Sequence, residues 1–298
     1  MQWALTAIHI CIPLIKIFPY EQLKGNPVNL PQADIKEDFL WQNRDHLFFY
    51  NGKGAIHFLA NSLKLKREDE VCILTSTDST YVATCVSATL FNYCKVSRVL
   101  SDKVKAIYII HEFGLPYPKI NEVANFAGKN NIPVIEDCAH SIDSTIHGQR
   151  IGTFGDFALY SLSKHLPIRN GGLLVGNKLK VSGVLSSYYN IDEARKVEEA
   201  FRQHYRLLPA ITELKRQNFS SVRNSFPQLK TVFELNGNIS PYFVIFKTPE
   251  YKKLYSLLAD KDIEWGRTHV ENWFCIPTQP FMGQNKLNEM VSLLKQYV

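Results

Sequence analysis

Short apolar runs that end in polar residues recur through the first two thirds of this chain. Runs of this kind are typical of parallel strands buried on both faces, and they occur at Glu70–Thr75, Lys105–Ile110, Ile132–Asp137 and Phe157–Leu162. Between them the apolar residues change to helical spacing, as in Ile56, Leu59, Ala60 and Leu63, in Val82–Leu90 and in Pro118–Asn130. Alternation of strand and helix at this spacing predicts an α/β domain with a mostly parallel sheet and right-handed crossovers.

The pattern changes after the further strand expected at Gly172–Val175. A long, charged, helical stretch runs from Glu193 to Gln217, and its charges are interpreted as a solvated face. A strand at 239–247, a helix at Tyr251–Lys261, short strands near 262–265 and 274–277, and a helix at Asn285–Tyr297 follow. We therefore expect an N-terminal arm over 1–45, a large α/β domain over 46–185, and a helical connection with a small α+β domain over 186–298.

Composition narrows the function classes. The chain has 298 residues, of which 45% are hydrophobic and 21% charged, which is ordinary for a globular protein. The formal net charge is +6, but the basic residues are scattered, which disfavours nucleic acid as a partner. The six cysteines form no CxxC pair, which indicates reduced thiols. The apolar start contains Pro13 and Lys16 and lacks a basic leader, so we expect a cytoplasmic protein without a membrane span.

The candidate chemistry gathers where two neighbouring strands end. The run that begins at Ile132 ends in Glu136 and Asp137, and His140 follows three residues later. The next strand is followed by Ser161 and Lys164. Open α/β sheets place ligands at the carboxyl ends of their parallel strands, so these side chains are expected to lie together. Glu136 points to the opposite face from its neighbour on a strand of period two, which predicts a structural role for it.

Three segments carry a family resemblance. EDCAHS, HGQRIGTFGDFALYS and the K-x6-GG pattern from Lys164 to Gly172 resemble the DegT/DnrJ/EryC1/StrS family of sugar aminotransferases, a branch of the fold-type I enzymes. The resemblance covers most of the chain from about residue 50 and is strongest over 104–177. It implies pyridoxal 5'-phosphate (PLP) as cofactor, with Lys164 as the Schiff-base lysine and Asp137 as the partner of the pyridine nitrogen. It also implies a homodimer with each site at the subunit boundary.

Further cofactor contacts follow from the resemblance. The turn Asn51-Gly52-Lys53-Gly54 matches the phosphate-binding element of the family, with Lys53 at the position of a threonine, so backbone amides at Lys53 and Gly54 would hold the phosphate. Tyr81 matches the aromatic that stacks on the cofactor ring, although a buried core tyrosine is an equal alternative. A plain turn is the alternative for the first segment.

Two more residues complete the expected site, one of them with a departure from the family pattern. His140 matches the Gln or His near the phenolic oxygen of the cofactor, where it could donate or stack; the alternative is a core histidine. Ser161 resembles the phosphate-binding serine, but it lies three residues before Lys164 where the family commonly has five. Either the loop is shortened or Ser163 takes part of the role.

The leading hypothesis from the sequence is an aminotransferase that moves an amino group from glutamate or glutamine to a keto group of a nucleotide-linked sugar. His165, beside the lysine, brings to mind a related dehydratase branch, but Lys164 keeps the register of the glycine pair and transamination is preferred. The rival from another class is a non-catalytic or regulatory member of the fold. A third interpretation is a PLP enzyme that acts on another keto or amino substrate. No metal site is expected.

Overall fold

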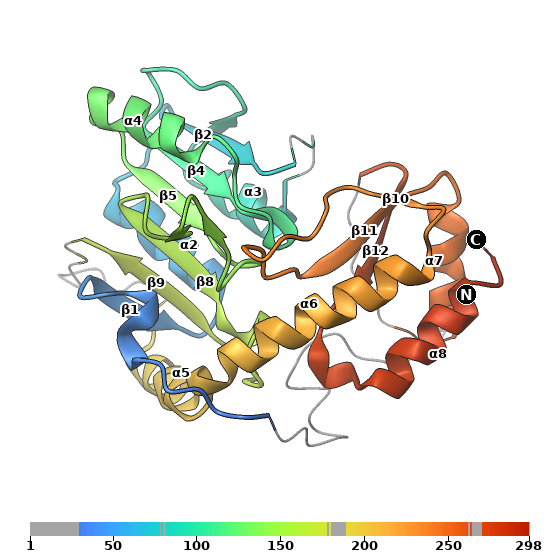
Figure 1. Cartoon of the computed structure of the whole chain (residues 1–298). Helices are drawn as coiled ribbons and strands as arrows, with labels where there is room; N and C mark the ends of the chain where they lie inside the picture. The colour runs from blue at the N-terminus through green and yellow to red at the C-terminus, as the bar shows by residue number, and fades with distance from the viewer. Residues whose placement is uncertain are drawn as a thin grey trace, which may run out of the picture.

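A seven-stranded sheet forms the centre of the protein (Figure 1). The computed structural model describes residues 30–77, 79, 82–177, 179, 189–261, 263 and 270–297. The strands follow the spatial order β1 (Asp45–Phe49), β9 (Gly172–Gly176), β8 (Phe157–Ser161), β5 (Val134–Asp137), β4 (Ala106–Ile110), β2 (Glu70–Thr75) and β3 (Lys95–Ser97). Six of these strands run in the same direction, and β9 runs in the opposite direction. The expectation of a mostly parallel α/β sheet is confirmed.

Helices cover both faces of the sheet, because successive side chains of its strands point to opposite sides. In β4, Tyr108 joins a core with residues of α2 (Gly52–Ser62) and α3 (Thr84–Leu90). Ile107 and Ile109 join a different core with residues of α4 (Ile120–Asn130). All five residues of β4 are buried, as expected for a central parallel strand.

A second, three-stranded sheet follows in the C-terminal part. Its strands are antiparallel, in the order β10 (Lys230–Thr231), β11 (Phe243–Lys247) and β12 (Trp273–Pro277). Helices α7 (Tyr251–Asp260) and α8 (Gln284–Leu294) share one hydrophobic core with it. The long helix α6 (Leu208–Ser225) follows α5 (Ile191–His204) and runs from beside the large sheet to the small one (Figure 1).

Shorter elements connect these parts. They are the 3-10 turns η1 (Glu37–Leu40), η2 (Glu112–Gly114), η3 (Leu162–Lys164), η4 (Tyr205–Leu207) and η5 (Pro280–Met282), and a hairpin of β6 (Thr145–Ile146) and β7 (Gln149–Arg150). None of the helices in the described part of the chain is long and apolar enough to cross a membrane.

The described part of the expected N-terminal arm leads into the first strand of the large sheet. Residues 45–49 form strand β1, and before it Leu40 and Trp41 pack into the same core as Phe201 of α5. This described part of the expected arm therefore lies against α5. The division of the chain at residue 45 and at residue 185 stays a proposal, since the second boundary lies outside the described residues.

Candidate functional site

The expected site residues meet at one edge of the large sheet. Strands β1, β8 and β5 run in the same direction, and their carboxyl ends deliver the start of α2, Ser161 with η3, and Asp137. The thiol of Cys85 in α3 lies within electrostatic range of three of the expected site residues. Burial raises its pKa, and the charges of Lys164, Asp137 and Lys53 all act on it. Three expected residues from three separate segments therefore share one electrostatic environment.

The amine of Lys164 lies 2.9 Å from Nε2 of His140. The backbone N–H of Phe113 donates to Nδ1 of the same ring over a long 3.4 Å. A backbone N–H can only donate, so Nδ1 is the acceptor and a neutral imidazole must carry its proton on Nε2. That N–H can in turn donate only to a nitrogen lone pair. In this tautomer the contact is a hydrogen bond when Lys164 is an uncharged amine, the form that attacks a carbonyl carbon.

Electrostatics point the same way for this lysine. Burial lowers the pKa of Lys164, while the nearby charges of Cys85 and Asp137 act in the opposite direction. Burial also holds the pKa of His140 well below its usual value, which keeps the imidazole neutral. A neutral histidine that donates to a neutral amine is consistent with both directions.

Asp137 is a buried carboxyl group with two partners. Tyr108 donates its hydroxyl to Oδ2 over 2.9 Å, and the backbone N–H of Ala139 donates to Oδ1 over 2.9 Å. Burial raises the pKa of Asp137, whereas these two hydrogen bonds and the charge of Lys164 lower it. A cation placed against this carboxyl group would favour its ionised form. Such an environment suits a partner for a protonated ring nitrogen.

Tyr242, just before β11, joins the small sheet to this site. Its ring stacks on that of His140, with centroids 4.7 Å apart and planes 7° apart. The amine of Lys164 lies 5.8 Å from the centre of the Tyr242 ring, and that of Lys215 lies 5.7 Å from it. The backbone N–H of Tyr242 donates to the carbonyl of Phe113 over 2.8 Å, which ties the two parts of the chain together at this point.

The expected phosphate end lies at the start of α2. Ser161 pairs with Gly172, and a Cβ atom on Gly172 would lie 2.6 Å from the backbone of Asn51. This close approach places the start of the helix over the end of β8. The amide of Gly54 already donates to the side chain of Asn51, over 3.0 Å, so a phosphate here would rely on the preceding amides, including that of Lys53. Tyr81 lies outside the described residues.

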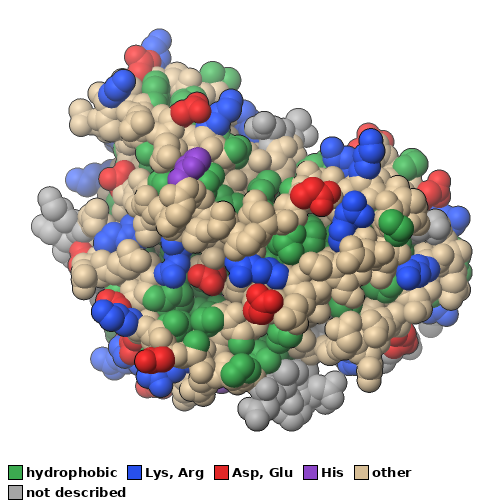
Figure 2. Space-filling model, viewed as in Figure 1, with side chains coloured by type: hydrophobic (Ala, Val, Ile, Leu, Met, Phe, Trp, Pro, Cys, Tyr) green, Lys and Arg blue, Asp and Glu red, His purple; other side chains and the backbone are tan. Residues whose placement is uncertain are grey.

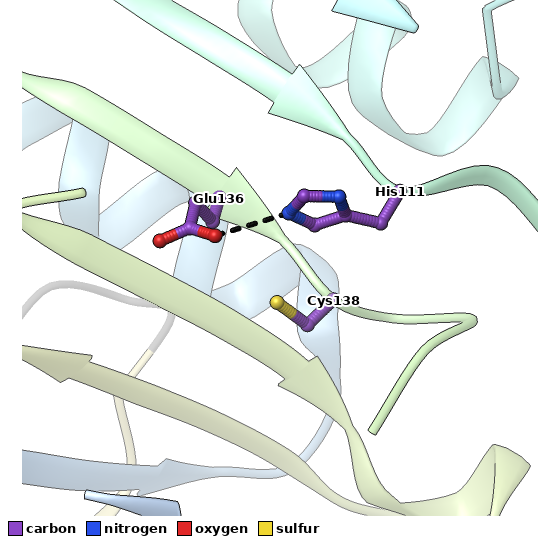
Figure 3. Close-up of side chains that lie close together, drawn as sticks. All are labelled: His111, Glu136 and Cys138. Atoms are coloured by element: carbon purple, nitrogen blue, oxygen red, sulfur yellow. Dashed lines mark hydrogen bonds and ion pairs between the residues drawn. The ribbon is translucent and has the colours of Figure 1, made fainter. Parts of the chain in front are cut away.

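A second cluster near the site is structural. The side chains of His111, Glu136 and Cys138 lie within 4.8 Å of one another, and Figure 3 shows the imidazole directed at the carboxylate. That carboxylate accepts from the backbone N–H groups of Gly152, Phe154 and Gly155, each over 2.7 Å, and from His111 Nε2 over 3.1 Å. The other imidazole nitrogen accepts from the N–H of Tyr117.

The carboxylate and both imidazole nitrogens of this cluster already take part in hydrogen bonds, which favours a structural role for it. The expected structural role of Glu136 agrees with this arrangement. The glycines of the GTFG segment follow from it as well: Gly152 has φ +84°, and a Cβ atom on Gly155 would lie 2.8 Å from the carbonyl oxygen of Val134. Both positions let the loop fold back with its N–H groups toward the carboxylate.

Comparison with known proteins gives a family match over the middle of the chain. Residues 89–182 match the profile of the DegT/DnrJ/EryC1/StrS aminotransferase family. The resemblance to this family is confirmed. GDP-perosamine synthase from Vibrio cholerae is 28% identical over 142 residues, which are 43% of this chain and 38% of that protein. The match to this relative therefore spans about two fifths of its length.

Solved structures of aminotransferases resemble nearly the whole chain in fold. The aminotransferase TlmJ from Streptoalloteichus hindustanus superposes with a TM-score of 0.71 at 14% identity, over 95% of this chain and 98% of that one. Spr1654 from Streptococcus pneumoniae, a sugar-aminotransferase candidate solved in its PLP form, gives 0.67 at 12% identity, over 95% and 96%. At these identities the likeness shows the fold alone, which this chain shares with these two proteins.

Several groups at this site were not expected from the sequence. Tyr108, Tyr242 and Cys85 come from elements whose spacing predicts only burial. Lys215 carried a readable signal, because it falls on the apolar stripe of α6 that Ile211 and Phe219 define. A charged residue on a buried helix face requires a partner, and this one lies beside the site.

Proposed function

We propose that this protein is a PLP-dependent aminotransferase that moves an amino group from glutamate or glutamine to a keto group of a nucleotide-linked sugar. The observation that carries the proposal is the contact of Lys164 with a neutral His140, in electrostatic range of a buried Asp137. The name of the Vibrio cholerae relative supports the substrate class, since it makes a GDP-linked amino sugar.

The residues present fit the cofactor. PLP needs a reactive amine, a carboxylate for its ring nitrogen and donors for its phosphate; Lys164, Asp137, and Ser161 with the first amides of α2 would supply them. When bound, the cofactor would supply an electron sink for a carbanion next to nitrogen. Around it, Lys164 would hold or release a proton at Nζ, and His140 would donate to that nitrogen whenever it is unprotonated.

Asp137 and its neighbours would supply orientation and charge. Its carboxylate would keep the ring nitrogen protonated, and the hydroxyl of Tyr108 would hold that carboxylate in place. Tyr242 would cover His140 and exclude water from the contact between the imidazole and Lys164. The contact of Tyr81 with the cofactor ring stays a proposal as well.

The test measures the absorbance of added PLP and its covalent attachment to the protein. The purified protein with added PLP should be yellow, and borohydride should fix the cofactor on the peptide that contains Lys164. Glutamate should bleach the colour, and a panel of keto-sugar nucleotides should restore it. Lys164→Ala should lose the fixed label, while Lys196→Ala, at an exposed lysine of α5, should keep it. A colourless protein that ignores PLP would favour the non-catalytic rival.

Assembly and location complete the proposal. We expect a homodimer, which light scattering after size-exclusion chromatography would test. We also expect a cytoplasmic location, where thiols stay reduced. The five cysteines in the described part of the chain are all free, which supports a reducing compartment: Cys72, Cys85, Cys94, Cys138 and Cys275. Figure 2 shows basic and acidic side chains interspersed over one face of the protein.

A further inference from the structure

Helix α6 carries a lysine that is almost completely buried. Lys215 is 1% exposed, and a lysine in the interior normally requires a partner. Its short contact is with an imidazole, Nδ1 of His165, over 2.9 Å. Asp143 acts on it electrostatically at longer range. Burying an amine against a neutral ring costs more free energy than filling the same space with an apolar side chain, which points to a role for this contact.

The hydrogen bonds around His165 define its direction. Its Nε2 lies 3.0 Å from the carbonyl oxygen of Ala139. A carbonyl can only accept, so Nε2 carries the proton, and Nδ1 of the neutral ring must accept from Lys215. Lys215 is therefore the donor of its pair, in either charge state. This is the reverse of the first pair, in which the amine of Lys164 accepts from His140.

The two Lys–His pairs are linked through the backbone. His165 directly follows Lys164, and Ala139, whose carbonyl it holds, directly precedes His140. The N–H of Ala139 in turn donates to Asp137. One histidine therefore fastens the segment that bears the amine to the turn between the carboxylate and the first histidine.

A second contact holds the same segment from the small sheet. Gln279, which follows β12, donates its Nε2 to the carbonyl oxygen of Lys164 over 2.8 Å. Two hydrogen bonds thus hold this part of the chain: Gln279 donates to the carbonyl of Lys164, and Lys215 donates to the imidazole of His165. Removing the amine of Lys215 would leave His165 without its donor and free the ring to turn away from Ala139.

We propose that Lys215 is a positioning residue for Lys164. Through His165 it fixes the turn at Ala139 and His140 against the Lys164 segment, so that His140 Nε2 stays in contact with the Lys164 amine. The inference deepens the proposed function, because it assigns a new residue to the same site. It concerns contacts within this chain, so it can be tested with and without the cofactor.

The first experiment measures the amine of Lys164 itself. The full-length protein without added cofactor is labelled with trace acetic anhydride across a pH series, and the Lys164 peptide is quantified by mass spectrometry. In Lys215→Met the donor is lost, the contact with His140 loosens, and the pKa of Lys164 rises toward its ordinary value. We expect labelling of Lys164 at pH 8.5 to slow about tenfold, which corresponds to a rise of about one pKa unit.

The choice of pH separates position from charge. Burial lowers the pKa of Lys215 to about 7, so its amine is largely uncharged at pH 8.5 and loss of a charge cannot explain the slowing. Lys196→Met, at an exposed lysine of α5, should label Lys164 at the wild-type rate. His165→Phe, which removes the acceptor, should reproduce the effect of Lys215→Met. If Lys215→Met does not fold, as judged by circular dichroism, His165→Phe and Lys215→Gln are compared instead.

A second measurement separates this inference from the proposed function. PLP is titrated into the same variants, and its attachment to Lys164 is followed by absorbance over pH. A wild-type protein that ignores PLP, with Lys164 labelling slowed in Lys215→Met, would overturn the function and keep the positioning role. PLP attachment with wild-type labelling rates in Lys215→Met and His165→Phe would overturn the positioning role and keep the function.

Discussion

Replacing Glu136 by Gln tests whether the His111, Glu136 and Cys138 cluster of Figure 3 stabilises the fold. The carboxylate is completely buried and accepts four hydrogen bonds, three of them from backbone N–H groups of the loop at 152–155. An amide keeps one accepting oxygen and turns the other into a donor. In one orientation the new NH2 group faces the N–H groups of Phe154 and Gly155; in the other it faces those of Gly152 and His111. Two donors lose their acceptor either way.

The magnitude follows from that count. A hydrogen bond to a charged group contributes about 1.5–3 kcal/mol, so losing two of them costs about 3–6 kcal/mol. Removing a buried charge returns part of this cost. We expect Glu136→Gln to lower the free energy of unfolding by about 3–5 kcal/mol, a large share of the total for a protein.

Urea unfolding followed by circular dichroism measures this loss, with Glu199→Gln at an exposed position of α5 as control. The control should stay within about 0.5 kcal/mol of the wild type. The structural account also expects zinc and EDTA to leave the unfolding curves of the wild type unchanged. A loss below about 1 kcal/mol in Glu136→Gln, or a stabilisation by zinc, would refute the reasoning.

Three further changes test the site. Gly172→Ala would push a Cβ atom into the backbone at the start of α2, so stability should fall by about 1–3 kcal/mol and PLP affinity should drop in a titration, while Gly237→Ala, with open space around it, should do neither. His140→Phe keeps a stacking ring but removes the donor to Lys164, so the pH at which PLP attaches should move upward in an absorbance series. Asp137→Asn should abolish productive PLP binding. Burial raises the pKa of Asp137 above its unfolded value of about 3.9, so the folded wild type binds this proton more tightly than the unfolded chain does. The stability that this proton contributes is lost as pH rises through the folded pKa. The melting temperature of the wild type should therefore fall relative to that of the variant as pH rises.

The parallel strands could be read from the sequence because burial on both faces leaves an unbroken apolar run. β4 and β5 are such strands, and their expected positions were within one or two residues of the observed ones. Strands β1 and β3 were not predicted from the sequence. β1 has only three consecutive apolar residues after Asp45 and His46, and β3 has three residues in all. Partners far along the chain, β9 and β2, determine that these segments are strands.

Some residues of the candidate site could likewise be predicted from the sequence, and others could not. The proximity of Asp137 and Lys164 could be predicted because Asp137 ends β5 and Lys164 follows β8, and these neighbouring strands run in the same direction. Lys215 lies on α6, and nothing local to that helix indicates which part of the sheet it crosses. Its place on an apolar stripe signals a buried amine, but the identity of its partner depends on tertiary packing.

The spacing between Ser161 and Lys164 is one of the departures from the family pattern, and the residues between them belong to the 3-10 turn η3. The backbone after Ser161 turns at once into a 3-10 helix, in which each residue advances by about 2 Å, less than in a strand. Leu162 anchors this turn: it is completely buried, and its N–H donates to the carbonyl of Gly171 over 2.9 Å. The amine of Lys164 contacts His140 from this compact turn. A phosphate contact of Ser161 then requires the start of α2 to approach β8 closely, and Gly172 provides that approach by having no side chain.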